Sequence, residues 1–109
     1  MTENTKVAIV TGAARGIGME IVRQLLEDGM TVVAVDLRED LLGELAEKLG
    51  NPGDALDART MDVTDSEGFA SLIDEVAEAY DRIDVLVNNA GITRDGLLMR
   101  MEDADWDMV

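Results

Sequence analysis

The chain has 109 residues, 47% of them hydrophobic, and a formal net charge of −15. The length allows one domain with a modest core, and the negative charge disfavours nucleic acid and acidic membrane surfaces as partners because like charges repel. No apolar run could span a membrane, residues 1–6 lack the features of a signal peptide, and there is no cysteine or histidine. We therefore expect a cytoplasmic protein without disulfides or a metal site. Two interpretations of the acidity stay open: an ordinary acidic surface, or adaptation to high salt, which screens self-repulsion.

Short apolar runs alternate with amphipathic stretches along the chain. The predicted strands are residues 7–10, 31–35, 58–61 and 83–87. The predicted helices cover residues 17–26, 41–49 and 64–80. In the third helix, Thr64 and Glu67 match the capping-box pattern, in which each side chain satisfies a free backbone amide at the start of the helix. A loop is expected after residue 91, and a further helix begins near Trp106.

The predicted order of elements is β-α-β-α-β-α-β. Such an order implies a parallel sheet with right-handed crossovers and helices on both faces. We therefore expect an α/β fold of the Rossmann type with strand order 3-2-1-4, in which the fourth strand is an unpaired edge. Residues 1–109 would form one dinucleotide-binding domain without an internal boundary.

A glycine-rich segment, residues 11–18, joins the first strand to the first helix. Gly12 allows a tight exit from the strand, Gly16 lets backbone amides approach an anion, and Gly18 allows close packing of the helix. The helix N-terminus adds free N–H groups and partial positive charge. This strand–loop–helix context predicts a site for a dinucleotide pyrophosphate.

An acidic residue, Asp36, ends the second strand about 20 residues further on. Its carboxylate can accept hydrogen bonds from ribose hydroxyls and would repel a 2′-phosphate, which favours NAD over NADP. Arg15 and Arg38 favour NADP instead, because a guanidinium can pair with that phosphate. NAD is the favoured cofactor on this evidence, and NADP stays open.

Three motifs now support a family resemblance: residues 11–18, Asp62-Val63 and Asn88-Asn89-Ala90-Gly91. With this spacing the chain resembles the short-chain dehydrogenase/reductase family over nearly its whole length. The stretch from residue 91 to residue 101, with Trp106-Asp107, resembles the family's 3-oxoacyl-[acyl-carrier-protein] reductases and the related acetoacetyl-CoA reductases.

The resemblance implies a set of cofactor-binding residues. They are Gly12, Arg15, Gly16, Ile17 and Gly18 at the pyrophosphate and ribose, Asp36 and Leu37 at the adenosine ribose, Asp62 and Val63 at the adenine, and Asn89, Ala90 and Gly91 beside the second ribose. Asn88 would tie the central strands together. Two alternatives stay open: Asp62 as an acid at the start of a helix, and Asn89 as a residue of a strand-end turn.

The resemblance also implies reduction of a carbonyl by hydride transfer, with a tyrosine as proton donor, a lysine four positions later and a serine. The only tyrosine here is Tyr80, and the fourth residue after it is Asp84, so we expect Tyr80 to serve the core or its boundary. We interpret the chain as a truncated, N-terminal cofactor-binding half that is inactive alone.

The intact enzyme would be a homo-oligomer acting on a 3-oxoacyl thioester, on acetoacetyl-CoA or on another small ketone. The alternative is a stand-alone nucleotide-binding or interaction module without catalysis.

Overall fold

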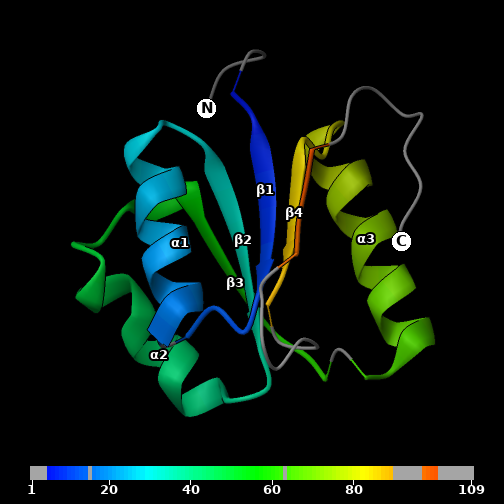
Figure 1. Cartoon of the computed structure of the whole chain (residues 1–109), viewed down its shortest axis with the longest axis horizontal. Helices are drawn as coiled ribbons and strands as arrows, with labels where there is room; N and C mark the ends of the chain where they lie inside the picture. The colour runs from blue at the N-terminus through cyan, green and yellow to red at the C-terminus, as the bar shows by residue number, and fades with distance from the viewer. Residues whose placement is uncertain (1–4, 15, 63, 90–96, 101–109) are drawn as a thin grey trace.

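A five-stranded sheet forms the centre of the molecule in the computed structural model, which describes residues 5–14, 16–62, 64–89 and 97–100. The strands are β1 (Val7–Thr11), β2 (Thr31–Asp36), β3 (Leu56–Thr60), β4 (Val85–Asn88) and β5 (Leu97–Arg100). The helices are α1 (Gly16–Glu27), α2 (Glu39–Lys48) and α3 (Ser66–Tyr80), with a short 3-10 helix at Gly53–Ala55. Helices α1 and α2 lie on one side of the sheet and α3 on the other (Figure 1). None of the helices that the structure describes is long and apolar enough to cross a membrane.

The strand order is β3-β2-β1-β4-β5. Strand β1 is central and pairs in parallel with β2 and with β4, so that Ala8 lies opposite both Val32 and Val85. Strand β3 pairs in parallel with β2. The predicted Rossmann-type α/β fold and its order 3-2-1-4 are therefore confirmed.

The predicted free edge at β4 is wrong. Strand β5 pairs with β4 in antiparallel register, with Val85 opposite Arg100 and Asn88 opposite Leu97. The link over residues 89–96 is shorter than the dozen or more residues that a parallel crossover needs, whereas an antiparallel return is possible. Because an open edge presents unpaired N–H and C=O groups, the apolar segment that we expected to be a loop pairs with it instead.

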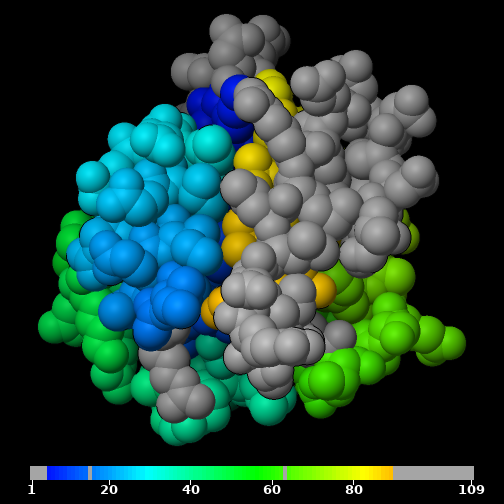
Figure 2. All heavy atoms as spheres, in the orientation of Figure 1, coloured from blue at the N-terminus to red at the C-terminus, as the bar shows by residue number. Residues whose placement is uncertain are grey.

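The core has two layers, one on each face of the sheet. Val7 and Ile9 of β1 pack with the apolar face of α3, which includes Phe69 and Val76. The alternate β1 residues, Ala8 and Val10, pack on the other face with Val22, Leu42 and Leu45 of α1 and α2. A strand covered on both faces needs apolar residues at every position, which explains the unbroken run in β1. In the space-filling view α1 (blue) and α3 (yellow-green) lie on opposite sides (Figure 2).

Two local predictions are corrected. The third strand begins at Leu56, two residues before the predicted residue 58, because none of the residues of this outer strand is buried and it lacks a continuous apolar run. The N-cap of α3 is Asp65, whose side chain accepts a hydrogen bond from the Gly68 amide at 3.2 Å. Thr64 is not the cap: its hydroxyl donates to Oδ1 of Asp62 at 2.6 Å.

Candidate functional site

The glycine-rich segment follows β1 at the point where the chain reverses its direction across the sheet. From β1 the chain continues through β2 to β3, and α3 then returns it to β4 on the other side of β1. In open parallel sheets, ligands bind in the crevice at the carboxyl ends of the strands flanking such a switch point. Thr11, Asn88 and Asn89 lie at the ends of β1 and β4, and Asp36 lies at the end of the neighbouring strand β2.

The glycines of this loop have different physical requirements. Gly12 and Gly16 adopt left-handed backbone conformations, with φ of 63° and 61°, which side chains disfavour. A Cβ atom at Gly16 would have no atom within 4 Å apart from its chain neighbours and the backbone of α1, and Gly16 is exposed at the start of that helix. At Gly18 a Cβ atom would overlap the carbonyl oxygen of Gly12 and lie 2.7 Å from its carbonyl carbon. The loop is thus folded tightly against α1 at Gly18 and leaves Gly16 exposed.

Thr11 connects β1 to the end of β4. Its fully buried hydroxyl donates to Oδ1 of Asn88 at 3.2 Å and accepts a hydrogen bond from the Asn89 amide at 2.9 Å. The Asn89 side chain in turn donates to the Gly12 carbonyl at 3.4 Å. These bonds agree with the expected role of Asn88 in tying the central strands, and they bring Asn89 beside the glycine loop.

Asp36 holds two backbone segments together. Its Oδ2 accepts from the Ala14 amide at 3.0 Å, and its Oδ1 accepts from the Arg38 amide at 2.9 Å. The Ala13 amide also donates to the Val35 carbonyl at 3.1 Å. Asp36, the last residue of β2, therefore binds the end of this strand to the glycine loop.

Arg38 is engaged by a neighbouring carboxylate. Its Nε donates to Oδ1 of Asp40 at 3.1 Å and its Nη2 to Oδ2 at 2.9 Å. These hydrogen bonds raise the pKa of Arg38 and lower the pKa of Asp40. Both groups are thus charged at neutral pH, and the paired edge of the guanidinium is occupied.

The remaining predicted site residues divide into three groups. Ile17 and Leu37 are large apolar residues that are 72% and 64% exposed at this edge of the sheet. Asp62 is exposed and accepts hydrogen bonds from the hydroxyl and the amide of Thr64, which lower its pKa and agree with the alternative of an acid at a helix start. Arg15, Val63, Ala90 and Gly91 lie outside the described residues.

Tyr80 has the expected role at the boundary of the core. It packs against the α3 side of the core, and its hydroxyl donates to Oδ2 of Asp57 at 2.7 Å. Burial, together with the hydrogen bond to this carboxylate, raises the pKa of Tyr80 to about 12. The phenol is therefore protonated at neutral pH and serves to hold α3 against β3.

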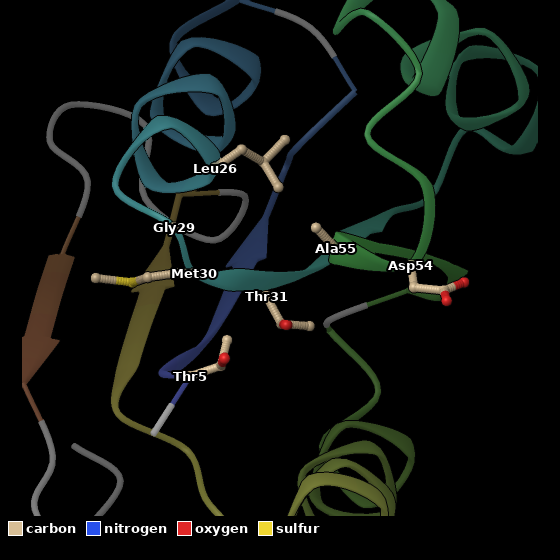
Figure 3. Close-up of a pocket in the computed structure, with 7 residues that line it drawn as sticks. All are labelled: Thr5, Leu26, Gly29, Met30, Thr31, Asp54 and Ala55. Atoms are coloured by element: carbon tan, nitrogen blue, oxygen red, sulfur yellow. The ribbon is translucent and has the colours of Figure 1, made fainter. Parts of the chain in front are cut away.

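A separate hollow of about 200 Å³ lies at the opposite, amino ends of the strands. Figure 3 shows its lining, which combines Leu26, Met30 and Ala55 with the polar residues Thr5 and Thr31. Because Thr5 precedes β1 and Thr31 begins β2, this hollow is far along the strands from the glycine loop. It is therefore distinct from the candidate site at the carboxyl ends.

Sequence reasoning missed two residues that organise the site. They are Thr11, which positions the Asn89 backbone, and Ala14, whose amide binds Asp36. A threonine at the end of an apolar, doubly buried strand is a usable signal, because a buried hydroxyl requires partners. The amide of Ala14 carries no signal in its side chain.

The fold and the loop define a class of protein: a Rossmann-type α/β domain with a glycine loop at its topological switch point. The family model for short chain dehydrogenases matches residues 6–109, and the chain belongs to this family. It is 45% identical over 105 residues to the 3-oxoacyl-[acyl-carrier-protein] reductase FabG of Thermotoga maritima, and 40% identical over 102 residues to FabG of Escherichia coli K12. The matches cover 95% and 94% of this chain but only 42% and 41% of the relatives' length.

Solved structures similar to this chain also include reductases of the short-chain type. A crystal structure of an actinorhodin polyketide ketoreductase variant with NADPH superposes with a TM-score of 0.74 at 40% identity, covering 82% of this chain and 34% of the ketoreductase. A metagenomic short-chain oxidoreductase in complex with NADP superposes with a TM-score of 0.73 at 35% identity, covering 84% of this chain and 42% of the oxidoreductase. The chain thus resembles the 3-oxoacyl reductases of its family and spans less than half of their length.

Proposed function

We propose that residues 1–109 form the dinucleotide-binding domain of an NAD(P)-dependent carbonyl reductase whose substrate is a 3-oxoacyl thioester. The observation that carries this proposal is the exposed, left-handed Gly16 at the start of α1, in the loop that follows β1 at the switch point of the sheet. Free amides at a helix N-terminus bind phosphate groups. The identity to the 3-oxoacyl reductases supports the substrate class.

The residues of this edge have separate roles in the proposal. Gly12, Gly16 and Gly18 shape the loop for the pyrophosphate, with Arg15 as its cation. Asp36 takes the adenosine ribose, and exposed Ile17 and Leu37 lose their contact with water when the nucleotide covers them. Asp62 and Val63 flank the adenine, and Asn89, Ala90 and Gly91 line the second ribose.

The bound dinucleotide would supply a hydride to the carbonyl carbon of the substrate. The described residues bind and orient it, whereas proton donation needs a group of suitable pKa close to the carbonyl oxygen. Tyr80 cannot donate this proton, because its hydroxyl is bound to Asp57 and its pKa is raised to about 12. The 109 residues contain no tyrosine followed by a lysine four positions later.

Calorimetric titration of the 109-residue chain with NAD tests the proposal. We expect saturable binding, weakened about tenfold or more in Gly16→Ala, because a displaced amide loses a hydrogen bond to a charged group. The matched control is Gly50→Ala, which has similar backbone strain (φ of 82°) and equally open surroundings, but follows α2. Equal loss of NAD affinity in both variants, or no binding by the unmutated chain, contradicts the proposal. With acetoacetyl-CoA and NADH or NADPH we expect no nucleotide oxidation above a buffer blank.

A further inference from the structure

We propose that Asp40 is a specificity-determining residue that keeps the Arg38 guanidinium from pairing with the 2′-phosphate of NADP. The discrimination against NADP would then depend on an ion pair as well as on Asp36. This inference rests on the proposed binding of an adenine dinucleotide at the carboxyl ends of the strands. It assigns a function to an acidic residue that the family motifs do not include.

The position of Arg38 makes it the relevant cation among the described residues at the end of β2. Its amide is bound to Oδ1 of Asp36 at 2.9 Å, so its backbone is fixed beside the carboxylate expected to meet the adenosine ribose. A 2′-phosphate on that ribose would lie within reach of an arginine at this position. Arg38 is half exposed and is the residue that precedes α2.

The geometry of the ion pair makes it a direct competitor of a phosphate. Asp40 takes Nε and Nη2 together, through two parallel hydrogen bonds of 3.1 and 2.9 Å. A guanidinium binds phosphate through the same kind of two-donor fork. NADP must therefore either displace the Asp40 carboxylate or bind Arg38 through its remaining donors.

The position of Asp40 in the helix keeps the carboxylate in place. It lies in the first turn of α2, where the helix dipole stabilises a negative charge. Asp36, Glu39 and Asp40 together carry three negative charges against the one positive charge of Arg38. A further phosphate would enter a region where these acids outnumber the cation, and Arg38, the cation among the described residues there, is already paired.

The test measures the Kd of NAD and of NADP, by calorimetry, for the unmutated chain and for Asp40→Asn. We expect the Kd of NADP to fall about two- to fivefold, the range of an exposed ion pair, and the Kd of NAD to stay unchanged. The matched control is Glu44→Gln, which removes the same charge one turn later in α2, where Glu44 pairs with Lys48 at 3.7 Å. This control should leave both constants unchanged.

A second pair of variants separates restraint of Arg38 from simple repulsion of the phosphate. If Asp40 acts through Arg38, its substitution has no effect on NADP affinity once Arg38→Gln is present. An equal gain in both backgrounds overturns the proposal, as does an unchanged NADP constant in Asp40→Asn. Circular dichroism checks the fold, and Asp40→Ser repeats the measurement with a side chain that favours the start of a helix.

The outcomes also separate this inference from the proposed function. If the unmutated chain binds neither nucleotide, the proposed function fails and this inference fails with it. If the chain binds NAD with the expected loss in Gly16→Ala, but Asp40→Asn leaves the ratio of the two constants unchanged, only the role of Asp40 is wrong.

Discussion

Gly18 has a requirement that differs from that of the glycines before it. Gly12 and Gly16 need a backbone conformation, whereas Gly18 needs space, because the Gly12 carbonyl overlaps the position of its Cβ and Nδ2 of Asn89 would be 3.0 Å from it. Backbone atoms cannot rotate away as the end of a flexible side chain can. A methyl group at position 18 would therefore force α1 and the loop apart.

We predict that Gly18→Ala lowers the free energy of unfolding by about 1–3 kcal/mol, the usual cost of overpacking, and weakens NAD binding. The control is Gly43→Ala, inside α2, where a Cβ would meet no atom within 4 Å. There the lower helix propensity of glycine is removed, and we expect a gain of about 0.5–1 kcal/mol. Urea denaturation measures both. A Gly18→Ala variant as stable as the unmutated chain would show that the loop does not approach α1 this closely.

At the scale of single residues, the sequence predicts where a side chain lies in the fold better than it predicts the hydrogen-bond partners of that side chain. Asp36 is recognisable as an acid at the end of a strand, and the structure places it there. Its bond to the Ala14 amide joins positions 22 residues apart, and a backbone amide has no signature in the sequence. The ion pair between Arg38 and Asp40 is local, but it depends on where α2 begins, and cap positions are the least predictable part of a helix.

At the scale of elements, the start of β4 is fastened to the start of β1 by one carboxylate. Oδ2 of Asp84 accepts from the Val7 amide at 2.8 Å, and the Asp84 amide donates to the Val7 carbonyl at 2.8 Å. Arg82 binds both carboxylate oxygens, at 2.8 and 2.7 Å. Burial would raise the pKa of Asp84, but the hydrogen bonds from Arg82 and from the Val7 amide outweigh it and lower the pKa.

We predict that Asp84→Ala lowers the free energy of unfolding at neutral pH by about 1–3 kcal/mol, because the buried Val7 amide loses its acceptor, and that Asp84→Asn costs less. The folded state binds this proton more weakly than the unfolded state. The contribution of the carboxylate is therefore complete above the unfolded pKa of about 3.9 and is lost as the pH falls through the lower folded value. Urea unfolding between about pH 6 and pH 3 measures this. A difference from Asp84→Asn that stays constant over this range would contradict the assignment.

The boundaries of elements show where pattern reasoning fails. Strands β1 and β2 are unbroken apolar runs, because both of their faces are covered, and they are easily recognised. Strand β3 is an outer strand with Asp57 and Arg59 in it, bonded to each other and to α3 through Tyr80 and Glu75. Charged residues of this kind hide a strand from a search for apolar runs. The N-cap of α3 is Asp65, one residue later than predicted. Thr64 and Asp65 are both favourable N-cap residues, but the Thr64 hydroxyl is bound to Asp62 and Asp65 caps the helix.

At the scale of the whole molecule, the alternation of strands and helices is enough to predict the order of the four parallel strands. Right-handed crossovers and burial of apolar faces leave few other arrangements. Strand β5 was not predictable in the same way. Its pairing depends on which edge of the sheet is open and on the length of the preceding link, and neither is encoded in Leu97–Arg100 itself.

The net charge of −15 is a property of the whole molecule that no single ion pair offsets. Many of the acidic side chains that the structure describes are exposed. Among them, Glu27, Glu47 and Glu78 form no ion pair with another described residue, since Arg23 pairs with Glu20 and Lys48 with Glu44. Mutual repulsion of such charges destabilises a compact state. Salt shortens the range of the repulsion, from a Debye length of about 10 Å at 0.1 M to about 3 Å at 1 M.

We therefore predict that potassium chloride raises the Tm of the chain, most steeply below about 1 M, where screening changes most. The matched variant carries Glu27→Gln, Glu47→Gln and Glu78→Gln, which reduce the negative charge by three. It should melt at a higher temperature than the unmutated chain in low salt and gain less from added salt. A Tm that continues to rise well above 1 M, beyond the range of screening, would favour adaptation to high salt over an ordinary acidic surface. A Tm independent of salt would contradict both the repulsion argument and the salt adaptation.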